Sequence, residues 1–105
     1  MKTIMLVCNA GMSTSMLVTK MQKAAQARGI EVEIWAVPVS EADNEVAAKT
    51  IDVLMLGPQV KFLLKDFKTK FEPAIKVDVI NMADYGLMNG DKVLETALTM
   101  MEEEV

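Results

Sequence analysis

The sequence contains no histidine and a single cysteine, Cys8. One cysteine excludes an internal disulfide framework, and the lack of histidine excludes a histidine-based metal site and a catalytic histidine dyad. An unpaired cysteine suits a reducing compartment, so we expect a cytoplasmic protein. The 11 basic residues are outnumbered by 15 acidic ones, and the net charge of −4 argues against a surface that binds nucleic acid.

Long apolar segments are also missing. The apolar segment after Lys2 is only about five residues long, whereas a signal peptide needs roughly 7–15, and bulky Val7 precedes Cys8 where a small residue is required. No other apolar run approaches the roughly 18–20 residues of a membrane span. The chain has 105 residues, of which 51% are hydrophobic, and we expect residues 1–105 to form a single domain with its own core.

Strand-like and helix-like segments alternate along the chain. The first and third strand-like segments are almost continuously apolar, which is typical of central strands in a parallel sheet, whereas the second and fourth alternate between apolar and polar residues. We therefore predict an α/β fold with a four-stranded parallel sheet in the order 2-1-3-4 and helices on both faces. The expected strands span residues 3–7, 30–37, 51–56 and 76–80, and the expected helices span residues 13–28, 40–50, 60–71 and 93–101.

Two local expectations complete this prediction. Ser40, which precedes an acidic first turn, is expected to be the N-cap residue of the second helix. The segment 81–89 shows no regular period, and we expect it to be irregular.

The predicted topology also places a binding site. In a parallel sheet of this kind, ligands bind beyond the carboxyl ends of the strands, at the point where the winding direction reverses. That point lies between the first and third strands, where the loops begin at Cys8 and at Gly57. A receiver-type signalling module would need an aspartate at the end of the third strand, where Leu56 stands, and the glycine patterns of dinucleotide-binding and Walker-type loops are missing.

The segment Cys8–Ser15 (CNAGMSTS) joins the end of the first predicted strand to the start of a helix. Gly11 allows backbone conformations in which successive N–H groups face inward, and the free N–H groups of the helix N-terminus add to this anion-binding loop. The three hydroxyl residues at positions 13–15 supply further hydrogen-bonding groups. We expect the same field to make Cys8 a nucleophile. In the alternative interpretation, Cys8 is a small apolar residue that ends a buried strand, and the serines only cap the helix.

Low-molecular-weight tyrosine phosphatases share a cysteine loop of this kind, which an arginine closes after five intervening residues. Thr14 stands at that position here, and the loop contains no arginine. Without a guanidinium group, charge on the phosphoryl group is less well neutralised, and hydrolysis should be slow. The nearest candidate for a general acid is Asp84, but an acidic residue in a turn more often serves to form the turn. The loop therefore favours holding a phosphoryl group over hydrolysing it, and a small cysteine-dependent phosphatase of this type remains the alternative function.

Two motifs and the order of the elements resemble a known family. The run Cys8–Ser15, continued by residues 16–21, closely resembles the enzyme IIB component of the lactose/cellobiose class of the bacterial phosphoenolpyruvate-dependent sugar phosphotransferase system. Leu56-Gly57-Pro58-Gln59 resembles the motif after the third strand in this family, and Tyr85-Gly86 before a terminal amphipathic helix also fits its pattern. The resemblance covers essentially the whole chain.

The resemblance implies a phosphoryl carrier, that is, a protein-cysteine sugar phosphotransferase. Cys8 would take the phosphoryl group from a phosphohistidine of a IIA partner and pass it to a disaccharide of the cellobiose, chitobiose or lactose type, which a membrane-embedded IIC partner binds. The protein would work as a monomer in the cytoplasm, at the inner face of the membrane beside IIC, with no metal or organic cofactor. Gln59 is a secondary site candidate. The residues expected to bind the phosphoryl group, mainly through backbone N–H groups, are Asn9, Ala10, Gly11, Met12, Ser13, Thr14 and Ser15.

Overall fold

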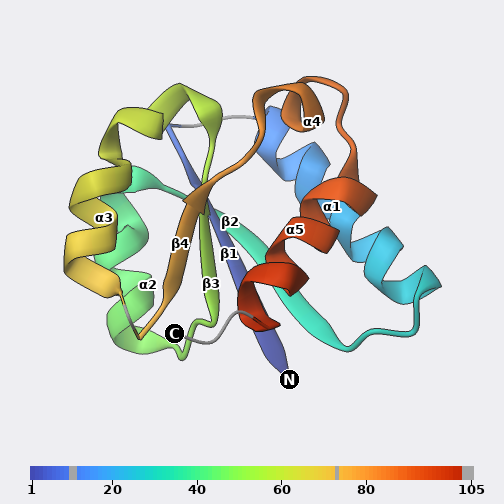
Figure 1. The fold of residues 1–105 in the computed structure, drawn as a ribbon, viewed down its shortest axis with the longest axis horizontal. Helices are drawn as coiled ribbons and strands as arrows, with labels where there is room; N and C mark the ends of the chain where they lie inside the picture. The colour runs from blue at the N-terminus through green and yellow to red at the C-terminus, as the bar shows by residue number, and fades with distance from the viewer. Residues whose placement is uncertain (10–11, 73, 103–105) are drawn as a thin grey trace.

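Strands and helices alternate along the chain in a computed structural model, which describes residues 1–9, 12–72 and 74–102, with residues 12 and 13 described by their backbone only (Figure 1). The four strands are β1 (Lys2–Cys8), β2 (Val32–Pro38), β3 (Val53–Leu56) and β4 (Lys76–Val79). The α-helices are α1 (Met12–Ala27), α2 (Ala42–Ala48), α3 (Leu64–Phe71), α4 (Met82–Gly86) and α5 (Gly90–Glu102), and short 3-10 helices span Val39–Glu41 and Pro58–Leu63.

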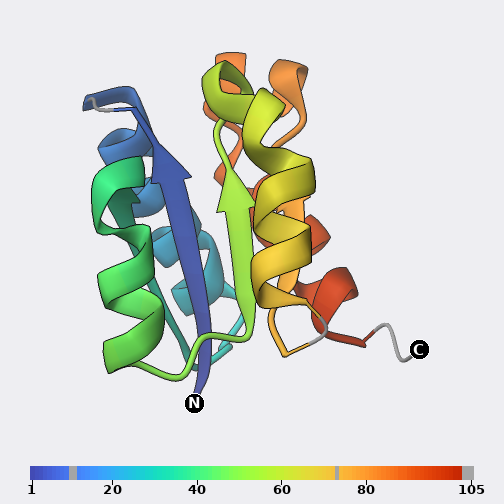
Figure 2. The same cartoon turned by 90° about the vertical axis from the view of Figure 1, so that its left-hand side faces the viewer.

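The strands form one parallel sheet in the order β2-β1-β3-β4, which confirms the predicted topology. The two central strands are the most apolar ones: β1 is buried from Ile4 to Cys8, and all four residues of β3 are buried. The edge strands β2 and β4 include exposed positions. Because all strands run in the same direction, their carboxyl ends meet along one side of the sheet, which we call the carboxyl edge (Figure 2, top).

Helices cover both faces of the sheet. α1 and α5 lie on one face, and α2 and α3 lie on the other (Figures 1 and 2). Alternate residues of β1 enter the two layers, because Ile4 and Leu6 pack with α1 and α5 whereas Met5 and Val7 pack on the side of α2 and α3. A fully buried side chain of this size contributes about 1.5–3 kcal/mol, and a shift of one residue would exchange the two sets, so burial on both faces sets the register.

α1 and α5 approach each other closely where α5 begins. A β-carbon added to Gly90 would lie 2.5 Å from the carbonyl carbon of Lys20 and 2.7 Å from the backbone nitrogen of Met21, so only glycine fits there. Gly29, the predicted stop of the first helix, has φ +69° and follows the end of α1 closely. The left-handed conformation at Gly29 carries no steric penalty because glycine has no β-carbon.

Beyond small shifts of their ends, two predicted helices differ from the structure in their cap or their continuity. The N-cap residue of α2 is Glu41 and not Ser40, and it makes no side-chain capping bond, because Ser40 is part of the preceding 3-10 helix. The helix predicted over residues 60–71 is divided into a 3-10 helix, Pro58–Leu63, and α3, with non-helical dihedral angles at Val60. The apolar stripe showed correctly which side faces the core, but it revealed neither the kink at Val60 nor the change of helical pitch at Leu64.

The expectation of an irregular segment at 81–89 is also wrong, because it contains α4. The side chain of Asn81 caps this short helix by accepting hydrogen bonds from the backbone N–H groups of Ala83, at 2.9 Å, and Asp84, at 3.1 Å. A helix of five residues is too short for a hydrophobic period to appear in the sequence, so its cap is the main local signal.

Candidate functional site

Cys8 is the last residue of the central strand β1, at the carboxyl edge of the sheet. Its register partner on β2 is Pro38, and the thiol is free and buried, with 6% of the residue exposed. Burial shields the thiol from bulk solvent, and Cys8 lies at the end of a central strand, the place in parallel sheets from which ligand-binding loops start.

Gly57 brings the loop after β3 against Cys8. The backbone N–H of Gly57 donates to the carbonyl oxygen of Val7 at 2.8 Å, which extends the pairing of β3 with β1 by one residue. A β-carbon on Gly57 would lie 3.2 Å from Cβ of Cys8 and 3.1 Å from Oε1 of Gln59. Cys8 and Gly57, the residues at which the two loops begin, therefore lie side by side, as the sequence predicted.

Gln59 places a polar side chain over this junction. It lies on the 3-10 helix that starts at Pro58, and its residue is exposed while Pro58 and Val60 on either side are buried. Oε1 of Gln59 and Cβ of Cys8 therefore both border the space beside Gly57. The amide offers both N–H donors and a carbonyl acceptor at the site.

The residues between Cys8 and the body of α1 are described in part. Asn9 is exposed, Ala10 and Gly11 lie outside the described residues, and α1 starts at Met12. The predictions for the side chains of Met12 and Ser13 also fall outside what the structure describes.

The hydroxyl residues Thr14 and Ser15 lie in different surroundings. Ser15 is exposed, accepts a hydrogen bond at its carbonyl oxygen from Oγ1 of Thr19, and lines a shallow groove of about 240 Å³ between α1 and β2. Thr14 is 1% exposed and is the only buried polar residue among those whose burial the structure describes. Thr14 therefore lies in the protein interior, whereas Ser15 lies at the surface.

Thr14 forms a hydrogen bond with a residue that our sequence analysis did not place in the site. Its Oγ1 lies 2.9 Å from the hydroxyl oxygen of Tyr85 on α4. Tyr85 follows β4, so the rule that ligand sites gather at carboxyl ends could have included it, but nothing in its local pattern pairs it with Thr14. The contact crosses 71 positions of the chain and arises only from the tertiary fold.

Asp84, the candidate general acid, has a structural role. It lies in the first turn of α4, its backbone N–H is bound by the Asn81 cap, and its carbonyl oxygen accepts a hydrogen bond from the backbone N–H of Asn89 at 2.9 Å. A carboxylate in the first turn of a helix is favoured by the helix dipole. These contacts favour the interpretation of Asp84 as a turn-forming residue.

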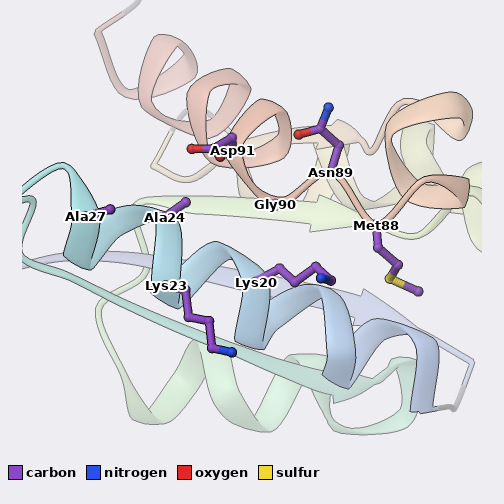
Figure 3. Close-up of a pocket in the computed structure, with 8 residues that line it drawn as sticks. All are labelled: Lys20, Lys23, Ala24, Ala27, Met88, Asn89, Gly90 and Asp91. Carbon is purple, nitrogen blue, oxygen red and sulfur yellow. The ribbon is translucent and has the colours of Figure 1, made fainter.

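A second groove, of about 380 Å³, lies between α1 and the start of α5 (Figure 3). Lys20 and Lys23 extend from α1, and the turn of residues 88–91 forms the other side. None of the predicted site residues lines this groove.

Two kinds of feature are absent from the described residues. Over residues 1–9, 12–72 and 74–102, no helix is both long enough and apolar enough to cross a bilayer. In the same residues, no three side chains of Cys, Asp or Glu come together as a metal ion would require.

Comparison with known protein families decides the family. The sequence model described as "PTS system, Lactose/Cellobiose specific IIB subunit", where PTS denotes a phosphotransferase system, matches residues 3–96. The chain belongs to this IIB family. It therefore belongs to the phosphotransferase systems that take up sugars, and the resemblance inferred from the Cys8–Ser15 and Leu56–Gln59 motifs is confirmed.

Curated relatives match over nearly the full chain. The galactose-specific EIIB component of Lactococcus lactis subsp. cremoris is 50% identical, over 95% of this chain and 96% of its own. The cellobiose-specific EIIB component of Lactococcus lactis subsp. lactis is also 50% identical with the same coverage. The oligo-beta-mannoside-specific EIIB component of Bacillus subtilis is 43% identical, over 96% of this chain and 97% of its own.

Solved structures agree with the fold. The cellobiose-specific phosphotransferase IIB component from Borrelia burgdorferi is 40% identical and superposes with a TM-score of 0.76, over 95% of this chain and 91% of its own. The lactose-specific IIB domain from Streptococcus pneumoniae shares the fold with a TM-score of 0.82 at 16% identity, covering 94% of this chain and 96% of its own. The predicted four-stranded architecture of a IIB domain is thereby confirmed.

Proposed function

We propose that Cys8 carries a phosphoryl group between two partners of a sugar phosphotransferase system. The thiolate attacks the phosphorus of a phosphohistidine on a IIA protein, so an S–P bond forms while the N–P bond breaks and the imidazole leaves. A hydroxyl of a sugar bound by a IIC protein then attacks the phosphorus of the phosphocysteine, so an O–P bond forms while the S–P bond breaks, and the proton lost by the hydroxyl balances the one that the released cysteine sulfur takes up. The observation that carries this proposal is the free cysteine at the end of β1, in contact with the Gly57 loop, in a chain of the IIB family.

The N-terminus of α1 suits the anion that this transfer creates. α1 has 16 residues, so its first N–H groups lack partners within the helix and carry the positive end of its dipole. Its first turn contains no acidic residue. The first turns of the other α-helices all do, with Asp43 and Glu45 in α2, Asp66 in α3, Asp84 in α4 and Asp91 in α5. This difference supports phosphoryl binding by the backbone from Asn9 to Ser15, beside Gln59.

Exposed apolar side chains around the carboxyl edge support protein partners at this site. Among the residues whose burial the structure describes, five large hydrophobic residues are exposed, and four of these lie in segments that follow the carboxyl ends of strands. They are Met16 on α1, Phe62 after β3, and Met82 and Leu87 on and after α4. Methionine adapts to different surfaces, which suits a protein that must dock against IIA and IIC in turn.

The sugar is proposed to be a disaccharide of the cellobiose, chitobiose or lactose type. The relatives with 43–50% identity are named for galactose, cellobiose and oligo-beta-mannosides, and the family is named for lactose and cellobiose. The partner IIC would bind the sugar, and this chain would deliver the phosphoryl group as a cytoplasmic monomer at the inner membrane face. Residues 1–105 would act as one domain without a metal or organic cofactor, because positioning and electrostatics carry such transfers.

The experiment incubates the protein with phosphoenolpyruvate, with the IIA protein of a lactose/cellobiose-type system and with the relay proteins that phosphorylate IIA. Peptide mass spectrometry then locates the phosphoryl group. We expect one phosphoryl group on Cys8 that persists until IIC and sugar are added. Cys8→Ser should fold, as shown by an unchanged circular dichroism spectrum, but should transfer nothing to the sugar. Sugar phosphorylation through Cys8→Ser would refute the mechanism.

The phosphatase alternative is tested in the same samples with an aryl phosphate. Thr14 stands where those phosphatases have their arginine, and its side chain is buried and bonded to Tyr85. A neutral hydroxyl in this position supports slow hydrolysis. Brisk aryl phosphate turnover without an adduct on Cys8 would replace the carrier function by the phosphatase function.

A further inference from the structure

The hydrogen bond between Tyr85 and Thr14 joins α1, the helix after the Cys8 loop, to α4, the helix after β4. The two hydroxyl oxygens are 2.9 Å apart, and Thr14 is almost completely buried. A buried hydroxyl without a partner would lose its hydration and gain nothing in return, so this bond is costly to break.

The hydrogen-bond partner of Thr14 differs in kind from the partners of three other threonines that lie in helices. Thr19, Thr96 and Thr99 each donate to the carbonyl oxygen four residues earlier in their own helix. Thr14 is the third residue of α1, so no carbonyl of the helix lies four residues before it. Its hydroxyl is therefore available for a tertiary contact, and that contact is Tyr85.

Tyr85 is itself held on a well-fixed segment. Its backbone N–H donates to the carbonyl oxygen of Asn81 at 2.9 Å, and the side chain of Asn81 caps α4. The backbone N–H of Ile80, just before this segment, donates to the carbonyl oxygen of Leu56 at the end of β3, at 2.8 Å. The Tyr85 ring is half-buried against the core formed by α1 and α5. The hydroxyl of Tyr85 is therefore held in place, and the start of α1 is hydrogen-bonded to it through Thr14.

We propose that Tyr85 is a positioning residue for phosphoryl transfer at Cys8. Its bond to Thr14 sets the position of the first turn of α1, whose free N–H groups would bind the transferring group. This proposal rests on the proposed function. A small displacement of the groups that align the reacting atoms lowers the rate of transfer even when the substrate still binds. We therefore expect kcat to fall while KM changes little.

Steady-state transfer from a phosphorylated IIA protein tests the bond directly. Tyr85→Phe removes a single oxygen, and we expect kcat to fall about five- to tenfold, the size of one neutral hydrogen bond, with KM for the donor within about twofold. Thr14→Val should show the same loss, and the double variant should be no slower than either single variant because both remove one interaction. Thr14→Ser keeps the hydroxyl and should retain most of the rate.

Two controls separate positioning from general destabilisation. Thr99→Val removes a helical threonine hydroxyl with a 2.9 Å bond on α5 and should leave kcat unchanged. Backbone amide NMR signals of residues 9–15 should shift alike in Tyr85→Phe and Thr14→Val, in a measurement that needs no partner. Additive losses in the double variant, or Tyr85→Phe with wild-type kcat and unshifted signals, would overturn the proposal. Shifted signals in a protein that never accepts a phosphoryl group would instead refute the proposed function.

Discussion

Gly57 leaves just enough room for the side chain of Cys8. A β-carbon on Gly57 would lie 3.2 Å from Cβ of Cys8 and 3.6 Å from the carbonyl oxygen of Val7, closer to Cys8 than such contacts normally are. The dihedral angles of Gly57, φ −62° and ψ 151°, are extended and open to any residue. Glycine is therefore favoured here by the limited space and not by the backbone conformation.

Gly57→Ala should crowd Cys8. We expect a loss of about 1 kcal/mol in the free energy of unfolding, because the cysteine β-carbon cannot move away as a flexible side chain could. We also expect slower alkylation of Cys8 by iodoacetamide. Gly86→Ala is the matched control, since nothing lies within 4 Å of a β-carbon there, and it should be at least as stable as wild type. If Gly57→Ala behaves like Gly86→Ala in both measurements, the close contact is not functional.

Gln59→Glu should impair phosphoryl transfer without unfolding the protein. The variant keeps the shape of the side chain but replaces the amide with a carboxylate beside the site, which should repel the phosphoryl group and slow transfer to Cys8 by about tenfold. The free energy of unfolding should not change because residue 59 is exposed. Gln26→Glu on exposed α1 surface makes the same charge change away from the site and should react at the wild-type rate. A Gln59→Glu variant as fast as Gln26→Glu would remove Gln59 from the site.

Gly90→Ala should weaken the packing of α1 and α5. The added carbon would meet the backbone of Lys20 and Met21 at 2.5–2.7 Å, and neither helix can yield without moving its whole axis. We expect a loss of about 3 kcal/mol, at the upper end for overpacking, in urea unfolding. Gly29→Ala, where space is free but φ is +69°, should cost only about 1 kcal/mol. Equal losses in the two variants would contradict this account of the helix contact.

The topology of the sheet could be predicted because burial leaves a direct record in the sequence. β1 and β3 are buried on both faces, so their sequences are almost continuously apolar. β2 and β4 are partly exposed, so apolar and polar residues alternate in their sequences. The short helix α4 left no such record, because five residues do not complete a hydrophobic period. The kink at Val60 was missed for a related reason, since an apolar stripe reports the buried side and not the helical pitch.

The local order of residues already predicted that Cys8 ends a central strand and that Gly57 lies beside it at the carboxyl edge. These follow from short-range patterns and from the rule that parallel strands end together. The bond between Thr14 and Tyr85 was decided by the tertiary structure alone. It depends on how far α4 lies from the start of α1, and this distance results from the packing of α1 and α5 on the sheet, which no local pattern encodes.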